Sequence, residues 1–272
     1  MKLIDFDAYF TDYLNAWVEA NQQKFKRPEE MEEQMPGVYL QFLNTAAEWL
    51  EGAAPGVYFD RYQDAEELCQ MLCAYVNSDT PVPDPLLDRL ADMDDEAALL
   101  ALIRDEKAPC AARMHGIELL RQLESSAPMV DYIRWQVDRS EDEDILDNAL
   151  ESLRAMGQSV QNPAKIAFRA AGQAGKEALL DVLCDFPADD EVFAFALECF
   201  QTQKGKRALF AGYLAKLEDD RALEALLEVA ESGGVDYIDF IEIRSAIERL
   251  GGEAPVRDFS KDPAYKAVRR LQ

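Results

Sequence analysis

Part of the sequence is repeated near its C-terminal end. Residues 208–227 echo residues 178–197 at an offset of about thirty positions. Self-similarity with a period of roughly 20–50 residues is typical of architectures in which one short unit stacks on the next. This internal repeat therefore constrains the fold more strongly than any single motif does.

Apolar residues recur three and four positions apart along almost the whole chain, which predicts amphipathic α-helices and no strands. Beyond about residue 93 the predicted helices pair into five hairpins, whose second helices end 30–33 residues apart. The hairpins are 94–104 with 109–123, 127–139 with 142–156, 159–171 with 174–186, 188–203 with 205–217, and 219–232 with 235–250. Single helices of about 12–15 residues are marginal in water, so the hairpins are expected to stack and share one core.

Glycines mark the expected turns between these helices. Gly157 is placed for a left-handed C-cap, and Gly172 with Gly175, Gly205, and Gly233 with Gly234 are expected to split the later hairpins. A turn glycine supplies a positive φ without steric cost.

Two stretches resemble a known repeat family. The first is Asp219 to Leu227, followed by Arg244 to Gly251, and it resembles a HEAT-like (armadillo-type) repeat, with an Asp-x-Arg-Ala run and a hydrophobic-plus-glycine ending. Residues 149–157 match the ending with Met156 in place of Leu. The resemblance covers about residues 94–250 and implies an α-solenoid there. The N-terminal part resembles no family of known activity.

The expected fold is all-α, an α-solenoid of about five HEAT-like hairpins with an N-terminal helical unit packed on it. Three prolines within residues 77–85 forbid a helix interior and suggest a boundary. The predicted domains are 1–80, an N-terminal helical unit; 81–257, the repeat array; and 258–272, a capping segment with Tyr265 and Val268 as its apolar contacts. An aromatic stripe through Phe6, Phe10, Tyr13 and Trp17 is expected to belong to the core.

The chain is strongly acidic, with 53 acidic residues against 28 basic ones and a formal net charge of -25. This charge opposes binding to nucleic acid and to acidic membrane surfaces, and it favours a basic protein or peptide partner. The N-terminal residues lack a signal-peptide pattern, and no run of 18 apolar residues occurs. Five scattered cysteines suit reduced thiols, so we expect a cytoplasmic protein.

Catalytic motifs are scarce. His115 is the single histidine, which rules out a His-Glu-x-x-His zinc motif and the several His-Glu pairs that resemblance to HEAT-type di-iron hydroxylases would require. Cys69 and Cys73 share a helix face, but they are predicted to be core residues rather than half of a zinc site. Acidic runs at 92–96 and 141–144 are predicted to cap helices. No catalytic residue, cofactor or metal site is predicted.

In solenoids of this kind the second helices usually line the concave face. The positions expected to face outward there are Asp147, Glu151, Asp181, Asp239 and Glu242. They predict a partly acidic groove that receives a basic or amphipathic protein segment, hence a non-enzymatic interaction scaffold or adaptor. Two alternatives stay open: an enzyme with a site between the N-terminal unit and the array, and an acidic mimic of nucleic acid. The sequence leaves the oligomeric state undetermined.

Overall fold

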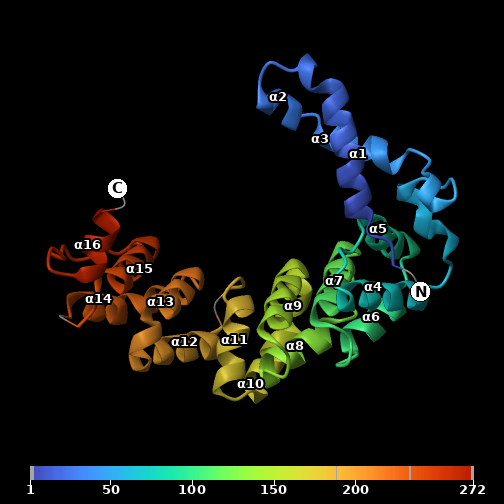
Figure 1. The fold of residues 1–272 in the computed structure, drawn as a ribbon. Coiled ribbons are helices and arrows are strands. Elements are labelled where there is room, and N and C mark those ends of the chain that lie inside the picture. The colour runs from blue at the N-terminus through green and yellow to red at the C-terminus, as the bar shows by residue number, and fades with distance from the viewer. Residues whose placement is uncertain (1–2, 188, 233, 271–272) are drawn as a thin grey trace. The chain divides into compact units, whose positions relative to one another are not determined.

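The computed structural model describes residues 3–187, 189–232 and 234–270, and in these ranges the chain is entirely helical, without a strand (Figure 1). The helices preceding the predicted array are α1 Phe6–Asn21, α2 Pro28–Glu32, α3 Met35–Leu43, α4 Ala65–Asn77 and α5 Asp84–Met93. Those that follow are α6 Glu96–Arg104, α7 Cys110–Gln122, α8 Met129–Asp138, α9 Glu143–Ala155, α10 Gln161–Ala170, α11 Gln173–Leu183, α12 Asp190–Thr202, α13 Arg207–Lys216, α14 Leu223–Glu231, α15 Tyr237–Arg249 and α16 Pro263–Arg269. The predicted all-α class is confirmed.

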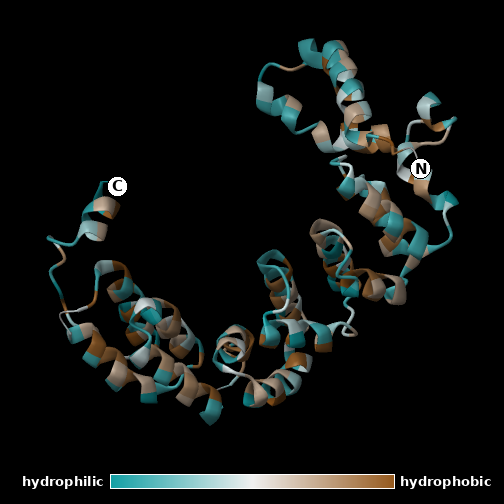
Figure 2. Ribbon diagram, turned by 60° about the horizontal axis from the view of Figure 1, so that its bottom comes forward, coloured by the Kyte–Doolittle hydropathy of each residue, from teal (hydrophilic) through white to brown (hydrophobic). Residues whose placement is uncertain are grey.

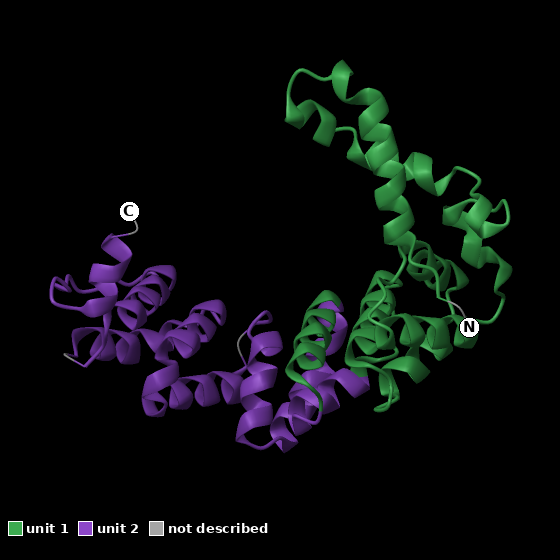
Figure 3. Cartoon of the chain, in the orientation of Figure 1, with its two compact units in different colours: residues 1–129, 141–155 green, residues 130–140, 156–272 purple. Residues whose placement is uncertain are grey.

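The chain forms two compact units (Figure 3). The first consists of Met1–Met129 with Glu141–Ala155, and the second of Val130–Ser140 with Met156–Gln272. This grouping does not test independent folding, so the predicted domain limits at residues 80 and 257 stay predictions. Among the described helices, none has both the length and the apolar character needed to cross a membrane.

In the first unit, the aromatic stripe of α1 packs against other aromatic rings. Phe6 is buried, with its ring centroid 5.4 Å from that of Trp49. The Phe10 ring lies 4.9 Å from Tyr39 and 5.3 Å from Phe42. Because these rings remove apolar area from water, the stripe serves the core, as expected.

The remaining helices of the first unit pack as successive pairs. Helix α4 contacts α5 and α6, α5 contacts α7, and α7 contacts both α6 and α9. The prolines around residue 83 lie where α5 begins, with Pro85 in its first turn, where a missing N–H costs nothing. Each helix carries apolar and polar residues together, as amphipathic helices do (Figure 2).

The second unit repeats the pairing. Helix α10 packs on α11, α12 on α13 and α14 on α15. The second helices α13 and α15 also pack directly on each other. Their observed bounds agree with the hairpins predicted from apolar spacing to within a few residues. The repeated unit read from the sequence is therefore a real helix pair.

The glycines divide into two kinds. Gly157 and Gly251 have φ values of 57° and 81° and end second helices, which confirms the predicted left-handed cap at Gly157. Gly172, with φ of -71°, instead precedes α11 in an extended conformation. Gly175 is not a turn residue, contrary to expectation: it lies inside α11, and a Cβ there would stand 2.8 Å from the carbonyl oxygen of Val137. Gly233 lies outside the described residues.

The C-terminal segment packs on α15, and its role as a cap of the last repeat stays a prediction. The ring of Tyr265 lies 4.9 Å from that of Tyr237, and the ring of Phe259 lies 4.9 Å from that of Phe240. Val268, the other predicted contact, is half-buried. Residues 271–272 of the predicted segment are outside the described part of the chain.

Candidate functional site

A groove of about 500 Å³ lies over the second helices of the second unit. We call it the α13–α15 groove, since most of its lining comes from these two helices and only Asp181 comes from α11. Its lining consists of Asp181, Ala208, Leu209, Gly212, Tyr213, Ala215, Lys216, Glu242, Ser245, Ala246 and Arg249. The groove has the size of a site for several side chains.

Small side chains line the middle of this groove. Gly212 lies inside α13, and a Cβ built there would meet no atom within 4 Å. Ser245 on α15 stands at the equivalent point of the next repeat, 33 residues later. Beside them Leu209 exposes 48 % of its surface, an apolar contact offered to solvent. The groove is thus open where the repeat carries small residues.

The repeat register explains why Asp181 joins this groove. It precedes Gly212 by 31 residues, one repeat, so both occupy the same position on successive second helices. Asp181 on α11 and Glu242 on α15 both belong to the lining, and α13 comes between their helices in the order of repeats. Two of the predicted residues thus line the same groove, and their role in partner binding stays a prediction.

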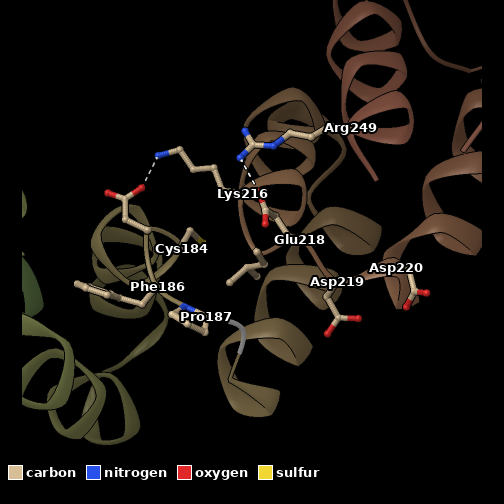
Figure 4. A pocket seen from close by; sticks show the side chains of 10 residues that line it. Cys184, Phe186, Pro187, Lys216, Glu218, Asp219, Asp220 and Arg249 are labelled. Atoms are coloured by element: carbon tan, nitrogen blue, oxygen red, sulfur yellow. Dashed lines mark hydrogen bonds and ion pairs between the residues drawn. The ribbon is translucent and has the colours of Figure 1, made fainter. Parts of the chain in front are cut away.

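The two cations in the groove already have carboxylate partners (Figure 4). Lys216 Nζ lies 3.2 Å from Asp185 Oδ1, and Arg249 Nη2 lies 3.3 Å from Glu218 Oε1. Each pair links one repeat to the next, 31 residues along the chain. The lining of the groove therefore holds two acidic and two basic side chains, and both basic side chains are paired with carboxylates of the preceding repeat.

A second hollow, of about 1010 Å³, adjoins the groove at the C-terminal ends of α11 and α13. Lys216 and Arg249 line both spaces, and Figure 4 shows Arg249 reaching towards Glu218. Burial raises the pKa of the Cys184 thiol in this hollow to about 12. The thiol therefore stays protonated at neutral pH and is a poor nucleophile.

Asp239, also predicted to bind a partner, lies in the first turn of α15 and is half-buried, so its role stays a prediction. The backbone N–H of Ala208, at the start of α13, faces this carboxylate and favours its charged form. Partial burial, followed by the charge of Asp236, raises the pKa of Asp239. A carboxylate at a helix N-terminus stabilises the unpaired N–H groups there, so Asp239 fastens α15 to α13.

Asp147 and Glu151 lie in the first unit, on α9. Both are exposed, and their spacing of four residues places them on one helix face. Glu151 Oε2 lies 3.0 Å from Arg121 Nη1 on α7. They form a separate acidic face, and their membership in a shared groove with Asp181 stays a prediction.

The sequence also raised the question of a zinc site at Cys69 and Cys73. These two residues border a hollow of about 470 Å³ in the first unit, between α4 and α6. Burial, and then the neighbouring Cys73, raises the pKa of Cys69 to about 12. Within the described ranges, no group of three or more histidine, cysteine or acidic residues is arranged to hold a metal ion. Cys69 is buried and Cys73 is half-buried.

Sequence analysis missed Leu209, Gly212, Lys216 and Arg249. One signal was present, because a glycine inside a helical pattern costs about 1 kcal/mol relative to alanine and usually has a packing or functional reason. The ion pairs of Lys216 and Arg249 could not be read from the sequence, since they depend on the stacking of one repeat upon the next.

Comparison of the chain with models of protein families, with curated proteins and with solved structures finds no match. The groove itself therefore carries the argument about function.

Proposed function

We propose that the helix pairs belong to a HEAT-like α-solenoid that acts as a non-enzymatic protein-binding scaffold. Support for the solenoid comes from each unit separately, since second helices pack on second helices in both, α7 on α9 and α13 on α15. Stacked helix pairs of this kind create extended surfaces suited to binding other proteins.

The α13–α15 groove is the observation that carries the binding proposal. Its lining combines an exposed apolar residue, Leu209, with two acidic residues, Asp181 and Glu242. Apolar contact supplies affinity, and opposite charge supplies specificity and a fast encounter. The partner is a basic or amphipathic segment of another protein, consistent with the net charge of -25.

Affinity capture with the tagged full chain tests this function. The bait is compared with an Asp181→Lys/Glu242→Lys variant, and bound proteins are eluted in salt steps up to about 0.5 M, where surface charges are screened. A matched control reverses Glu224 and Glu228, which are exposed on α14. We expect basic proteins to be lost from the groove variant and retained by the control.

A second variant, Asp147→Lys/Glu151→Lys, asks whether the acidic face of α9 contributes to the same partner. Thermal unfolding of every variant serves as the control that its fold is intact. The same proteins recovered in the same amounts with the groove variant and with the unchanged chain would overturn the binding proposal.

A further inference from the structure

We infer that the junction between the helix pairs α10–α11 and α12–α13 is a joint, and that two ion pairs between α11 and α13 hold it closed. The lining of the α13–α15 groove includes Asp181 of α11 together with residues of α13, so movement of α11 against α13 changes the width of the groove. As regulation of the groove this inference rests on the proposed function, whereas the movement itself is measured without any partner.

The two pairs pack unevenly on each other. Helix α11 contacts α12, but among the described helices it has no contact with α13 as extensive as that of α13 with α15. The first helices meet through apolar side chains, since the ring of Phe168 on α10 lies 5.4 Å from that of Phe195 on α12. This ring contact on the side of the first helices is the pivot of the joint.

The second helices α11 and α13 leave open space at their C-terminal ends. The hollow of about 1010 Å³ is lined there by residues 184–187, which follow α11, and by residues 216–220 at the end of α13. Protein interiors are otherwise close-packed, and a packed interface resists movement. At this hollow the two helix ends can approach or separate without a clash.

Ion pairs bridge α11 and α13 near both of their ends. Glu177 Oε2, in the first half of α11, lies 2.6 Å from Nζ of Lys206, which directly precedes α13. Gln203 Nε2 also donates to Glu177 Oε1 at 2.7 Å. Beyond the other end of α11, Asp185 Oδ1 lies 3.2 Å from Lys216 Nζ. Two helices that pack little on each other are thus held together by charge.

Salt acts on these ion pairs and not on the pivot. The side chains of Lys206 and Lys216 are 54 % and 35 % exposed, so mobile ions reach both pairs. Their attraction weakens as the Debye length falls from about 10 Å at 0.1 M salt to about 3 Å at 1 M. Apolar contacts lack this dependence on ionic screening. Rising salt, or charged groups of a bound partner, should therefore release α11 from α13 while Phe168 stays against Phe195.

Double electron–electron resonance on the full chain measures this movement. Spin labels are attached to a keto amino acid introduced at the labelled positions, so the native cysteines stay unchanged. One label pair replaces the exposed residues Ala174 on α11 and Ile238 on α15, whose helices lie on either side of α13 in the order of repeats. The reference pair replaces the exposed residues Ile166 on α10 and Glu198 on α12, the helices of the pivot.

The decisive variant is Glu177→Gln/Asp185→Asn, which removes the carboxylate charge of both ion pairs with little change in side-chain shape. Glu248→Gln is the matched control, because it breaks an exposed ion pair with Arg244 that lies within α15 and crosses no junction. Circular dichroism and thermal unfolding verify that each variant is folded.

We expect the distance between labels 174 and 238 to lengthen or broaden by roughly 2 Å or more when salt rises from about 0.05 M to about 0.5 M. The charge-neutral variant should show the wide distribution already at low salt, and the Glu248→Gln control should behave as the unchanged chain. The distance between labels 166 and 198 should change by less than half as much.

A distance between labels 174 and 238 that does not respond to salt would overturn the joint. Equal shifts of both label pairs would overturn the pivot, since the whole junction would then loosen. If the charge-neutral variant does not fold, the salt series on the unchanged chain decides alone. Movement without any captured partner would refute the proposed function and leave the joint standing, whereas capture that depends on Asp181 and Glu242 without movement would refute only the joint.

Discussion

Arg113 and Glu141 form a buried ion pair, with Nη1 of the arginine 2.7 Å from Oε2 of the glutamate. Their side chains are only 6 % and 10 % exposed. Arg113 lies on α7, and Glu141 comes just before α9. The Nε of Arg113 also donates to the carbonyl oxygen of Ile103 at 2.9 Å. This single guanidinium therefore ties three successive segments of the first unit together.

Removal of the Glu141 carboxylate should lower the free energy of unfolding. Glu141→Ala leaves a buried cation without its carboxylate, and we expect a loss of about 3–5 kcal/mol in the free energy of unfolding. Glu248→Ala, which breaks the exposed pair with Arg244, is the control and should cost less than about 1 kcal/mol. Urea denaturation measures both, and equal losses would show that burial of the pair does not matter.

Replacement of Glu124 by glycine should stabilise the protein. It ends α7 with a φ of 54°, and the N–H of Ser125 reaches back to the carbonyl oxygen of Leu120 at 3.0 Å. Glycine adopts this conformation without a Cβ clash, so Glu124→Gly should raise stability by roughly 0.5–1 kcal/mol. The same change at Glu118, inside α7, should lower it by about 1 kcal/mol. Shifts of the same sign at both positions would contradict the prediction.

Two helix-interior glycines should respond to alanine in opposite ways. At Gly175 a Cβ would stand 2.8 Å from the oxygen and 2.9 Å from the Cα of Val137, which are backbone atoms. Gly175→Ala should therefore cost about 1–3 kcal/mol. Gly212→Ala meets open space and should gain up to about 1 kcal/mol from helix propensity. Thermal unfolding of the two variants side by side decides the matter.

Phe259 should contribute more than Val268 to the packing of the C-terminal segment on α15. Its ring packs 4.9 Å from Phe240 and 5.4 Å from Tyr237, both on α15. Phe259→Ala should cost about 2 kcal/mol, below the range for fully buried phenylalanines, because the ring is half-buried. Amide exchange in α15 should speed up. Val268→Ala should leave this exchange nearly unchanged; if it instead accelerates exchange equally, the cap depends on α16 as a whole.

The buried thiols should be unreactive in the folded protein. Burial raises the pKa of Cys69 and of Cys184 from the usual 9 to about 12. Alkylation at about pH 8 should therefore be slow until urea unfolds the chain. The folded protein keeps protons that the unfolded chain releases above pH 9, so these groups should lower stability as pH rises from 9 towards 12. Equal alkylation rates with and without urea would show that burial does not protect the two thiols.

Much of the local structure could be read from the sequence. Apolar spacing placed the helix pairs within a few residues of their observed bounds, because an amphipathic helix must carry its buried side chains at regular intervals. The repeat period also placed Asp181 and Glu242 on helices that line one groove. The surroundings of Asp239 could not be predicted, since Ala208, which influences the pKa of its carboxylate, comes from another helix.

The sequence by itself determined the all-α class, the helix pairs α6–α7, α10–α11, α12–α13 and α14–α15, and the left-handed cap at Gly157, because these depend on neighbours within about one repeat. Only the tertiary structure decided that Gly175 packs on Val137, that Lys216 and Arg249 pair with the preceding repeat, and that Gly212 leaves a groove open. The physical reason is that a helix pattern tells which face is buried, whereas the atoms facing that surface are chosen by how one helix stacks against the next.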